Sequence, residues 1–253
     1  MHIAIVIPTY NEAENLPKLV STLFALPLDL SILVVDDNSP DGTGNVADEL
    51  AISSAGRVSV LHRPKKLGLS SAYVQGFHHM LEQGADAIAQ MDADFSHDPL
   101  ALVTMAKCLE TCDAVFGSRY TQGGNIDIRW PFWRRVLSAW GNFYARMILR
   151  IPLRDVTTGY RLWRSEMLRG LPLSFIQSNG YIFQVEMAYL AYCLEYRLGE
   201  TPIHFVDRQR GKSKMSIRIQ TEAALRVWQI WLKHRHLCHI GRAARIQPFQ
   251  AIA

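Results

Sequence analysis

The sequence has no apolar run of the 18 or so uncharged residues that a transmembrane helix requires. Its first residues, Met-His-Ile-Ala-Ile, also lack the basic start of a signal peptide. With 49% hydrophobic residues among 253, nothing in the composition indicates disorder, and the chain can bury the core of one α/β domain. We therefore expect a folded protein that is cytosolic or bound to a cytosolic surface.

Cysteine is scarce, and its spacing shows neither a metal-binding pattern nor an evident disulfide framework. The four cysteines are Cys108, Cys112, Cys193 and Cys238. The first two lie four residues apart on a predicted helix, which favours two buried small apolar side chains. Cys238 and the histidines near it could form a zinc site. This site would lack a second ligand pair at suitable spacing, so we favour a solvated basic tail for this segment. The candidate zinc ligands are His234, His236, Cys238 and His239.

A glycine-rich turn is absent after the first apolar segment, because IPTYNEAEN (residues 7–15) contains no glycine. The dinucleotide-binding fingerprint requires glycines at that turn. The sequence therefore disfavours a dinucleotide-binding dehydrogenase.

Acidic residues are nearly absent from the C-terminal arm. From Arg208 onward there are ten Lys and Arg residues and a single acid, Glu222, which gives this arm a charge of +9. The whole chain has a net charge of +4, so residues 1–207 carry −5. Such a basic arm suits phosphates, whether of a nucleotide, an anionic membrane or a nucleic acid.

The first half of the chain alternates between two kinds of segment. Short apolar segments of strand length cover residues 3–8, 31–36, 58–62 and 87–91. Segments with helical periodicity cover residues 12–25, 43–51, 69–83 and 99–109. This alternation predicts an α/β fold with a mostly parallel sheet covered on both faces, in which ligands bind beyond the carboxyl ends of the strands.

The second half contains a further predicted strand at residues 115–119 and two amphipathic helices at 132–150 and 217–233. Both helices carry aromatic side chains with arginines nearby, so each can either pack on the domain or lie in a membrane interface. We leave both possibilities open for the first helix and favour the membrane for the second. The charged, glycine-containing segment 210–214 predicts a loop that acts as a lid.

Two aspartates follow the fourth apolar segment. In an extended segment Asp92 and Asp94 point to the same side, and Ala93 faces away. Two carboxylates at this spacing suit Mg²⁺ or Mn²⁺, which commonly completes its shell with water and substrate phosphates. Asp94 could instead cap the next helix, but Asp98 before Pro99 is the better cap, which leaves the aspartate pair without a structural task.

Further polar residues are expected at the same edge of the sheet. The carboxylates of Glu12, Asp36 and Asp37 would repel a phosphate. They more plausibly accept hydrogen bonds from ribose hydroxyls or a base. The positive charge around a diphosphate would come from Arg119, Arg208 and Lys214.

The ordered set of motifs resembles one known family. The motifs are IPTYNEAENL, VVDDNSPDGT, KKLGLSSAYVQGF, QMDADFSHDP, FGSRY, DVTTGYRLWR and VDRQRGKSK. They are similar to those of the polyprenol phosphate mannosyltransferases, the dolichol-phosphate-mannose synthase group of family 2 inverting GT-A glycosyltransferases, from about residue 3 to residue 233. The resemblance implies a GT-A catalytic domain at residues 1–215, which includes an acceptor-side helix at 132–150, and a C-terminal basic amphipathic helix and tail at 216–253.

The resemblance also implies roles for individual residues. The nucleoside would be held by Pro8, Tyr10, Glu12, Val35 and Asp37. The donor diphosphate would be held, through Mg²⁺ or Mn²⁺ on the two aspartates, by Asp92, Ala93 and Asp94. The donor diphosphate or the acceptor phosphate would be contacted by Arg119, Arg208 and Lys214. The acceptor phosphate would be gripped by Arg134 and Ser138, which complete a catalytic set with Asp94 and Arg119. Some relatives add a metal contact from a glutamine at the position of Ser96, so a water would intervene here.

The implied reaction moves mannose from GDP-mannose to a polyprenyl (dolichyl-type) phosphate with inversion. The implied location is peripheral, on the cytoplasmic face of a membrane, with a possible membrane-anchoring partner subunit and no nucleic acid. One alternative is transfer of glucose or another sugar from a UDP donor to a polyprenyl phosphate. The other is a non-catalytic adaptor that binds lipid or nucleic acid, which would leave the aspartate pair unexplained.

Overall fold

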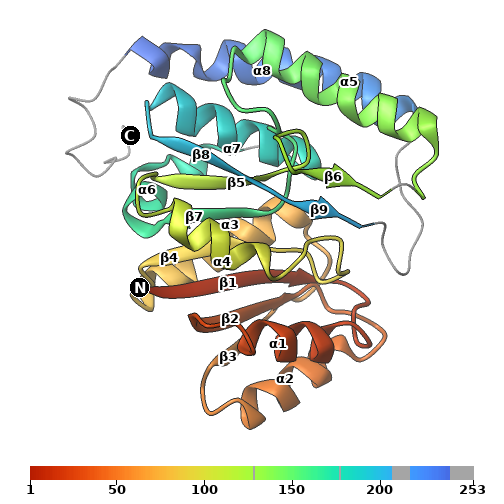
Figure 1. The fold of residues 1–253 in the computed structure, drawn as a ribbon. Coiled ribbons are helices and arrows are strands. Elements are labelled where there is room, and N and C mark those ends of the chain that lie inside the picture. The colour runs from red at the N-terminus through yellow and green to blue at the C-terminus, as the bar shows by residue number, and fades with distance from the viewer. Residues whose placement is uncertain (128, 177, 207–216, 240–253) are drawn as a thin grey trace.

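The computed structural model describes residues 1–127, 129–176, 178–206 and 217–239. These residues form a seven-stranded sheet with helices on both faces and a separate two-stranded ribbon (Figure 1). The large sheet contains β1 (His2–Thr9), β2 (Asp29–Asp36), β3 (Val58–His62), β4 (Ala87–Gln90), β5 (Ala114–Ser118), β7 (Arg161–Arg164) and β8 (Leu198–Pro202). The ribbon pairs β6 (Asn125–Ile126) with β9 (His204–Phe205). The helices are α1 (Leu16–Phe24), α2 (Thr43–Ser53), α3 (Leu69–Glu82), α4 (Ala101–Cys108), α5 (Phe132–Leu149), α6 (Ser165–Gly170), α7 (Tyr181–Cys193) and α8 (Ile217–His234), with 3₁₀ turns η1 (Leu173–Phe175) and η2 (Arg235–His239).

The strand order of the large sheet is β3-β2-β1-β4-β7-β5-β8. Every neighbouring pair is parallel except the two that involve β7, which is antiparallel to both β4 and β5. The predicted α/β fold with a mostly parallel sheet is confirmed. Because β7 runs the other way, its first residue lies at the edge where β4 and β5 end.

Two buried clusters cover the two faces of the sheet. In β1, Ile3, Ile5 and Ile7 face the cluster under α1, α2 and α4, whereas Ala4 and Val6 face the cluster under α3 and α7. All five are fully buried, which is the near-continuous apolar pattern of a parallel strand covered on both faces. The sheet is therefore the middle of three layers, and its ends are the places where polar side chains can gather.

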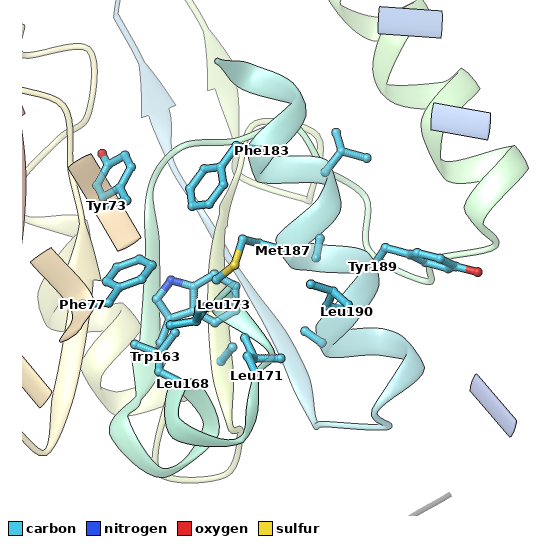
Figure 2. Packing of buried hydrophobic residues seen from close by; sticks show 14 of the residues in the cluster. Tyr73, Phe77, Trp163, Leu168, Leu171, Leu173, Phe183, Met187, Tyr189 and Leu190 are labelled. Carbon is cyan, nitrogen blue, oxygen red and sulfur yellow. The ribbon is translucent and has the colours of Figure 1, made fainter. Parts of the chain in front are cut away.

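Helix α7 was not predicted from the sequence. It is buried on almost its whole circumference, so its sequence shows no amphipathic period. Figure 2 shows Phe183, Met187 and Leu190 of α7 packed with Phe77 and Trp163 in the cluster that covers one face of the sheet. A helix that is covered on all sides has a continuous apolar sequence, and periodicity cannot distinguish such a sequence from that of a buried strand.

Helix α8 is held to the core by a buried polar pair. His234 Nε2 lies 2.8 Å from Glu186 Oε1 of α7, and both side chains are almost fully buried. The other carboxylate oxygen of Glu186 accepts a hydrogen bond from the main-chain N–H of Ser178 at 3.0 Å. Burial alone would raise the pKa of Glu186, but its hydrogen bonds to His234 and Ser178 outweigh this and lower it. His234 is thus a packing residue and not part of a solvated tail.

One pair of cysteines forms a disulfide that their spacing in the sequence did not make evident. Cys193 at the end of α7 and Cys238 in η2 form a disulfide across a sequence separation of 45 residues. The pair meets only because α8 folds back along α7, which spacing in the sequence does not show. Cys108 and Cys112 are free and half-buried, and Cys112 lies in the turn after α4, so the prediction of two buried helical side chains is wrong.

The two amphipathic helices lie side by side on one flank of the molecule (Figure 1). The Tyr144 hydroxyl of α5 donates to the carbonyl of Ala224 in α8 at 3.3 Å, and the Trp228 indole N–H donates to that hydroxyl at 3.1 Å. Both helices also keep large apolar side chains exposed, including Trp133 and Trp140 of α5 and Leu225 of α8. Helices α5 and α8 therefore pack on the domain and also present apolar side chains to the outside. In the described part of the chain, no helix has both the length and the apolar character needed to cross a membrane.

Candidate active site

The polar residues singled out from the sequence gather at one edge of the sheet. Strands β1, β2, β4 and β5 are parallel and end in turn at Thr9, Asp36, Gln90 and Ser118. The segments that follow them carry Tyr10 to Glu12, Asp37, Asp92 to Asp94 and Arg119. In an open α/β sheet this edge is the usual place of a ligand.

The aspartate pair lies in a tight, hydrogen-bonded turn directly after β4. Asp92 Oδ1 accepts a hydrogen bond from the Tyr73 hydroxyl at 3.3 Å, and Asp94 Oδ1 accepts one from the main-chain N–H of Ser96 at 3.0 Å. Phe95, which follows, has a φ of 58°, a conformation that non-glycine residues adopt only where their surroundings enforce it. The expectation that the two aspartates have no structural task is therefore wrong, since the carboxylate of each accepts a hydrogen bond within the fold.

Two residues that the sequence analysis missed support this turn. His97 Nδ1 accepts a hydrogen bond from the main-chain N–H of Asp92 at 3.2 Å, and the His97 ring stacks on Tyr160 at 5.0 Å. Tyr73 of α3 is fully buried below the turn, between Phe77 and Phe183. Burial, followed by the charges of Asp92 and Asp94, raises the pKa of Tyr73 well above 10, so the hydroxyl remains a donor. The histidine stands in the motif DADFSHDP, but nothing local in the sequence connects Tyr73 to it.

The expected nucleoside-binding residues lie at the ends of β1 and β2. Pro8 is half-buried opposite Val35, and the half-exposed Tyr10 ring lies under Lys66 Nζ at 3.4 Å from its centroid. The main-chain N–H of Glu12 donates to Thr43 Oγ1 at 2.9 Å. The side chain of Val35 is fully buried in the core, so a contribution of this residue to binding would come from its main chain.

Asp37 is already engaged by a cation that the sequence analysis did not identify. Its carboxylate forms a buried ion pair with Arg63, which follows β3. The same guanidinium donates to Ser71 Oγ at 2.7 Å and to the carbonyl of Gly68 at 3.0 Å, at the start of α3. Asp37 thus joins the end of β2 to the α3 turn. The adjacent Asp36 accepts hydrogen bonds from Thr9 and Ser39 and acts as a structural residue of its own turn.

Arg119 lies in a buried ion pair at the end of β5. Its guanidinium makes two hydrogen bonds to the Asp155 carboxylate, at 2.7 and 2.9 Å, and a third to Thr157 Oγ1 at 2.7 Å. Burial would raise the pKa of Asp155, but the charge of Arg119 outweighs this and lowers it. The pKa of Arg119 is raised in turn, because the attraction of Asp155 outweighs burial. The expected phosphate contact is therefore made by an arginine whose charge is already paired.

Arg134 and Ser138 lie on α5, as the sequence indicates, and one contact joins that helix to the edge of the sheet. The Tyr120 and Ser138 hydroxyls are 3.1 Å apart, and Tyr120 directly follows Arg119. The Arg134 guanidinium stacks on the Trp130 ring at 3.7 Å. Tyr120 thus connects the expected acceptor-side helix to the buried pair at β5. Arg208, Lys214 and the expected lid at 210–214 lie outside the described residues.

The aspartate turn suits a divalent cation that is shared with a substrate. Its donors are oxygens, the class that Mg²⁺ and Mn²⁺ prefer. Close to the pair, the Ser96 hydroxyl is fully buried and has no hydrogen-bond partner among the residues that the structure describes. Within the described residues, no group of three or more His, Cys, Asp or Glu side chains is placed to hold a metal. The remaining ligands would therefore be waters and phosphate oxygens, which is typical of Mg²⁺ sites in phosphate-handling enzymes.

Comparison of the sequence with known proteins identifies the family to which the chain belongs. The family described as "Glycosyl transferase family 2" matches residues 4–171, which include most of β1 and every later strand up to β7. The chain belongs to glycosyl transferase family 2. This family 2 glycosyltransferase is 44% identical to an undecaprenyl-phosphate mannosyltransferase of Micrococcus luteus over 227 residues, covering 90% of this chain and 93% of that one. It is 42% identical to a polyprenol monophosphomannose synthase of Mycolicibacterium smegmatis over 232 residues, covering 91% and 87%.

Solved structures confirm the GT-A fold of this glycosyltransferase. Mannosyl-3-phosphoglycerate synthase from Rubrobacter xylanophilus matches with a TM-score of 0.64 at 15% identity, covering 98% of this chain and 78% of that one. A mannosyltransferase from Pyrobaculum calidifontis, solved with GDP-mannose and Mn²⁺, matches with a TM-score of 0.61 at 15% identity, covering 94% and 68%. At such identities the likeness concerns the fold alone. The expected division into residues 1–215 and 216–253 stays a prediction.

Proposed function

We propose that this glycosyltransferase moves mannose from GDP-mannose to the phosphate of a polyprenyl lipid and gives a β-linked product with inversion. The observation that carries the proposal is the similarity, above 40% identity over nine tenths of the chain, to two proteins named for mannose transfer to polyprenyl phosphates. The geometry supports it, because the aspartate turn and Arg119 lie at one edge, next to the helix that carries Arg134 and Ser138.

The proposed acceptor explains why the edge needs no general base. A phosphate monoester has a second pKa near 6 and is already an anion at neutral pH, so it can attack without losing a proton. A bound Mg²⁺ or Mn²⁺ on Asp92 and Asp94 would neutralise the donor diphosphate and stabilise it as the leaving group. Tyr73 and His97 hold the aspartate turn in place from below. Arg134 and Ser138 then orient the acceptor phosphate for in-line attack on the anomeric carbon.

The donor is tested by measuring transfer with purified protein. Labelled GDP-mannose and labelled UDP-glucose are each incubated with the protein and a short polyprenyl phosphate. Each donor is tested with Mg²⁺, with Mn²⁺ and with EDTA. We expect a lipid-phosphate mannose only with GDP-mannose and a divalent cation, and no product when a polyprenyl alcohol replaces the phosphate. Transfer from UDP-glucose alone would overturn the mannose assignment and keep the acceptor class. No transfer from any donor would overturn the proposed reaction.

The location that we propose is peripheral, on the cytoplasmic face of a membrane. The support is the flank formed by α5 and α8, where Phe132, Trp133, Trp140 and Met147 of α5 are all exposed. Trp and Phe side chains on a helix that also carries arginines suit the headgroup region of a bilayer. A polyprenyl chain stays in the bilayer, so the phosphate must be reached from this flank. A membrane-anchoring partner subunit stays a prediction.

Replacing Trp133 and Trp140 together by serine should weaken binding to vesicles of phosphatidylcholine and phosphatidylglycerol by at least about tenfold, because two large apolar side chains no longer leave water. The side chains are 62% and 61% exposed in the structure, so the fold should tolerate the change. Co-flotation measures the effect. The matched control is Ile52→Ser, since Ile52 is 85% exposed on α2, far from this flank (Figure 1). Equal losses in both variants, or none in the double variant, would contradict the proposed membrane face.

A further inference from the structure

The two free cysteines lie together at the edge of the sheet opposite the candidate active site. Cys108 is the last residue of α4, and Cys112 comes two residues before β5 begins at Ala114. The candidate active site is at the edge where β5 ends, at Ser118, so the start of β5 belongs to the opposite edge. Both thiols are half-buried. The proposed sugar transfer gives this pair of thiols no task.

The two sulfur atoms converge on one point above the edge strand β8. A Cβ atom added to Gly199 of β8 would lie 2.7 Å from Cys112 Sγ and 2.9 Å from Cys108 Sγ. Both distances are well below an ordinary van der Waals contact, so only a residue without a side chain leaves room for the two sulfurs. Because each sulfur lies so close to the same point, the two thiols face each other in the space above Gly199.

The turn that carries Cys112 is fixed by bonds that involve neither sulfur. On one side, Arg164 of β7 donates from Nε to the carbonyl of Cys112 at 2.9 Å and from Nη2 to the carbonyl of Leu109. On the other side, the main-chain N–H of Asp113 donates to the carbonyl of Arg197 at 2.8 Å, and the N–H of Arg197 donates to the Asp113 carboxylate at 2.8 Å. The fold therefore holds the thiols together before any reaction.

A held pair of thiols favours a disulfide over two separate modifications. Two groups that are fixed in contact react with each other at a high effective concentration, because the loss of translational and rotational freedom has already occurred on folding. A second small thiol has no such advantage. The arrangement at Gly199 thus suits a reaction in which Cys108 and Cys112 bond to each other.

A metal site is the other use of two adjacent thiols, and the structure disfavours it. Among the residues that the structure describes, no third His, Cys, Asp or Glu side chain joins the pair to make a metal-binding group. Metals bind the thiolate and not the thiol. Burial, followed by the neighbouring Cys112, raises the pKa of Cys108, which keeps that thiol protonated at neutral pH.

We propose that Cys108 and Cys112 are a redox-active dithiol that a low-molecular-weight disulfide of the glutathione type converts reversibly to an intramolecular disulfide. One cysteine, as a thiolate, attacks a sulfur of the small disulfide and releases one small thiol. The other cysteine then attacks the mixed disulfide and releases the second. One S–S bond breaks and one forms, and the two protons of the cysteines end on the two released thiols. The dithiol loses two electrons, which the small disulfide gains.

The rival explanation is that the two thiols only fill space against β8 as small apolar side chains. In that case an oxidant would leave them unchanged or would modify each of them separately. The experiment equilibrates the purified full chain at about pH 8, where thiolates form, with mixtures of reduced and oxidised glutathione. Free thiols are then blocked by alkylation, and peptide mapping by mass spectrometry reads the state of each cysteine.

The wild type should lose two hydrogen masses and show a bond between Cys108 and Cys112 without bound glutathione. In Cys108→Ser and in Cys112→Ser, the remaining thiol should instead carry glutathione. Gly199→Ala puts a methyl group where the sulfurs meet, so half-oxidation should require a mixture at least about tenfold more oxidising. The matched control is Gly141→Ala on α5, which should behave as the wild type because a Cβ there meets no atom within 4 Å.

Three results would overturn the inference. They are a dithiol that persists in the most oxidising mixture, glutathione bound to both cysteines of the wild type, and a bond from either thiol to Cys193 or Cys238. An unchanged midpoint in Gly199→Ala would show that the arrangement above β8 does not control the reaction, and it would overturn the inference as well. The wild type alone decides the first three results, so a variant that fails to fold does not remove the test. No step uses sugar transfer, so the result is independent of the proposed function.

Discussion

Replacing Asp94 by alanine lowers the rate of sugar transfer by about 10²–10³-fold or more, which is the scale on which removal of one transition-state contact acts. Asp94 is almost fully buried in the turn after β4, where its Oδ1 accepts a hydrogen bond from the Ser96 N–H that fixes the carboxylate in the turn. Without this carboxylate, only Asp92 remains to hold the metal and its diphosphate. Stimulation of GDP binding by Mn²⁺ should therefore be lost together with turnover, as calorimetry and the transfer assay would show.

The control for this variant is Asp98→Asn. Asp98 lies in the same loop, and its carboxylate accepts a hydrogen bond from the main-chain N–H of Leu100 at 3.0 Å, a contact that asparagine keeps. Its activity should stay within a factor of about two of the wild type. If Asp94→Ala stayed folded and still transferred sugar at a normal, metal-dependent rate, the aspartate pair would not be the cation site.

Replacing Asp155 by asparagine lowers the free energy of unfolding by about 3–5 kcal/mol, because the Arg119 guanidinium is then buried without its counter-charge. Asp155 is fully buried and takes two hydrogen bonds from that guanidinium. Urea titration at neutral pH measures the difference. The control is Asp113→Asn, since its partner Arg197 is exposed and Asp113 itself is only partly buried, so this pair should contribute only about 0.2–1 kcal/mol.

The same pair predicts a pH dependence with a definite sign. The pKa of Asp155 is lower in the folded protein than in the unfolded chain, so its contribution to stability is present above the unfolded value near 4. It is lost as the pH falls through the folded-state pKa. The gap in unfolding free energy between wild type and Asp155→Asn should therefore be constant above about pH 5 and narrow below pH 4. A gap that stays constant down to pH 2, or widens there, would contradict the pairing.

The sequence by itself determined the first half of the fold and the place of the aspartate pair. Segments 3–8 and 58–62 were expected as strands and are found within β1 and as β3, because apolar periodicity is a local signal. The edge position of Asp92 followed from the rule that parallel strands end together. The antiparallel direction of β7 could not be predicted, because the sequence of a short apolar strand does not show which way it runs in the sheet. Helix α7 could not be predicted, because a helix buried on all sides has no amphipathic period.

Tertiary structure alone decided which charges meet. Arg63 and Asp37 are 26 residues apart, Arg119 and Asp155 are 36 apart, and Cys193 and Cys238 are 45 apart. The sequence marks Arg119 as a phosphate-binding cation, whereas the structure pairs its guanidinium with Asp155. The physical reason is that residue type and local periodicity fix each segment's own preference. The balance of buried charge depends on distances between segments, and these exist only after the strands have paired.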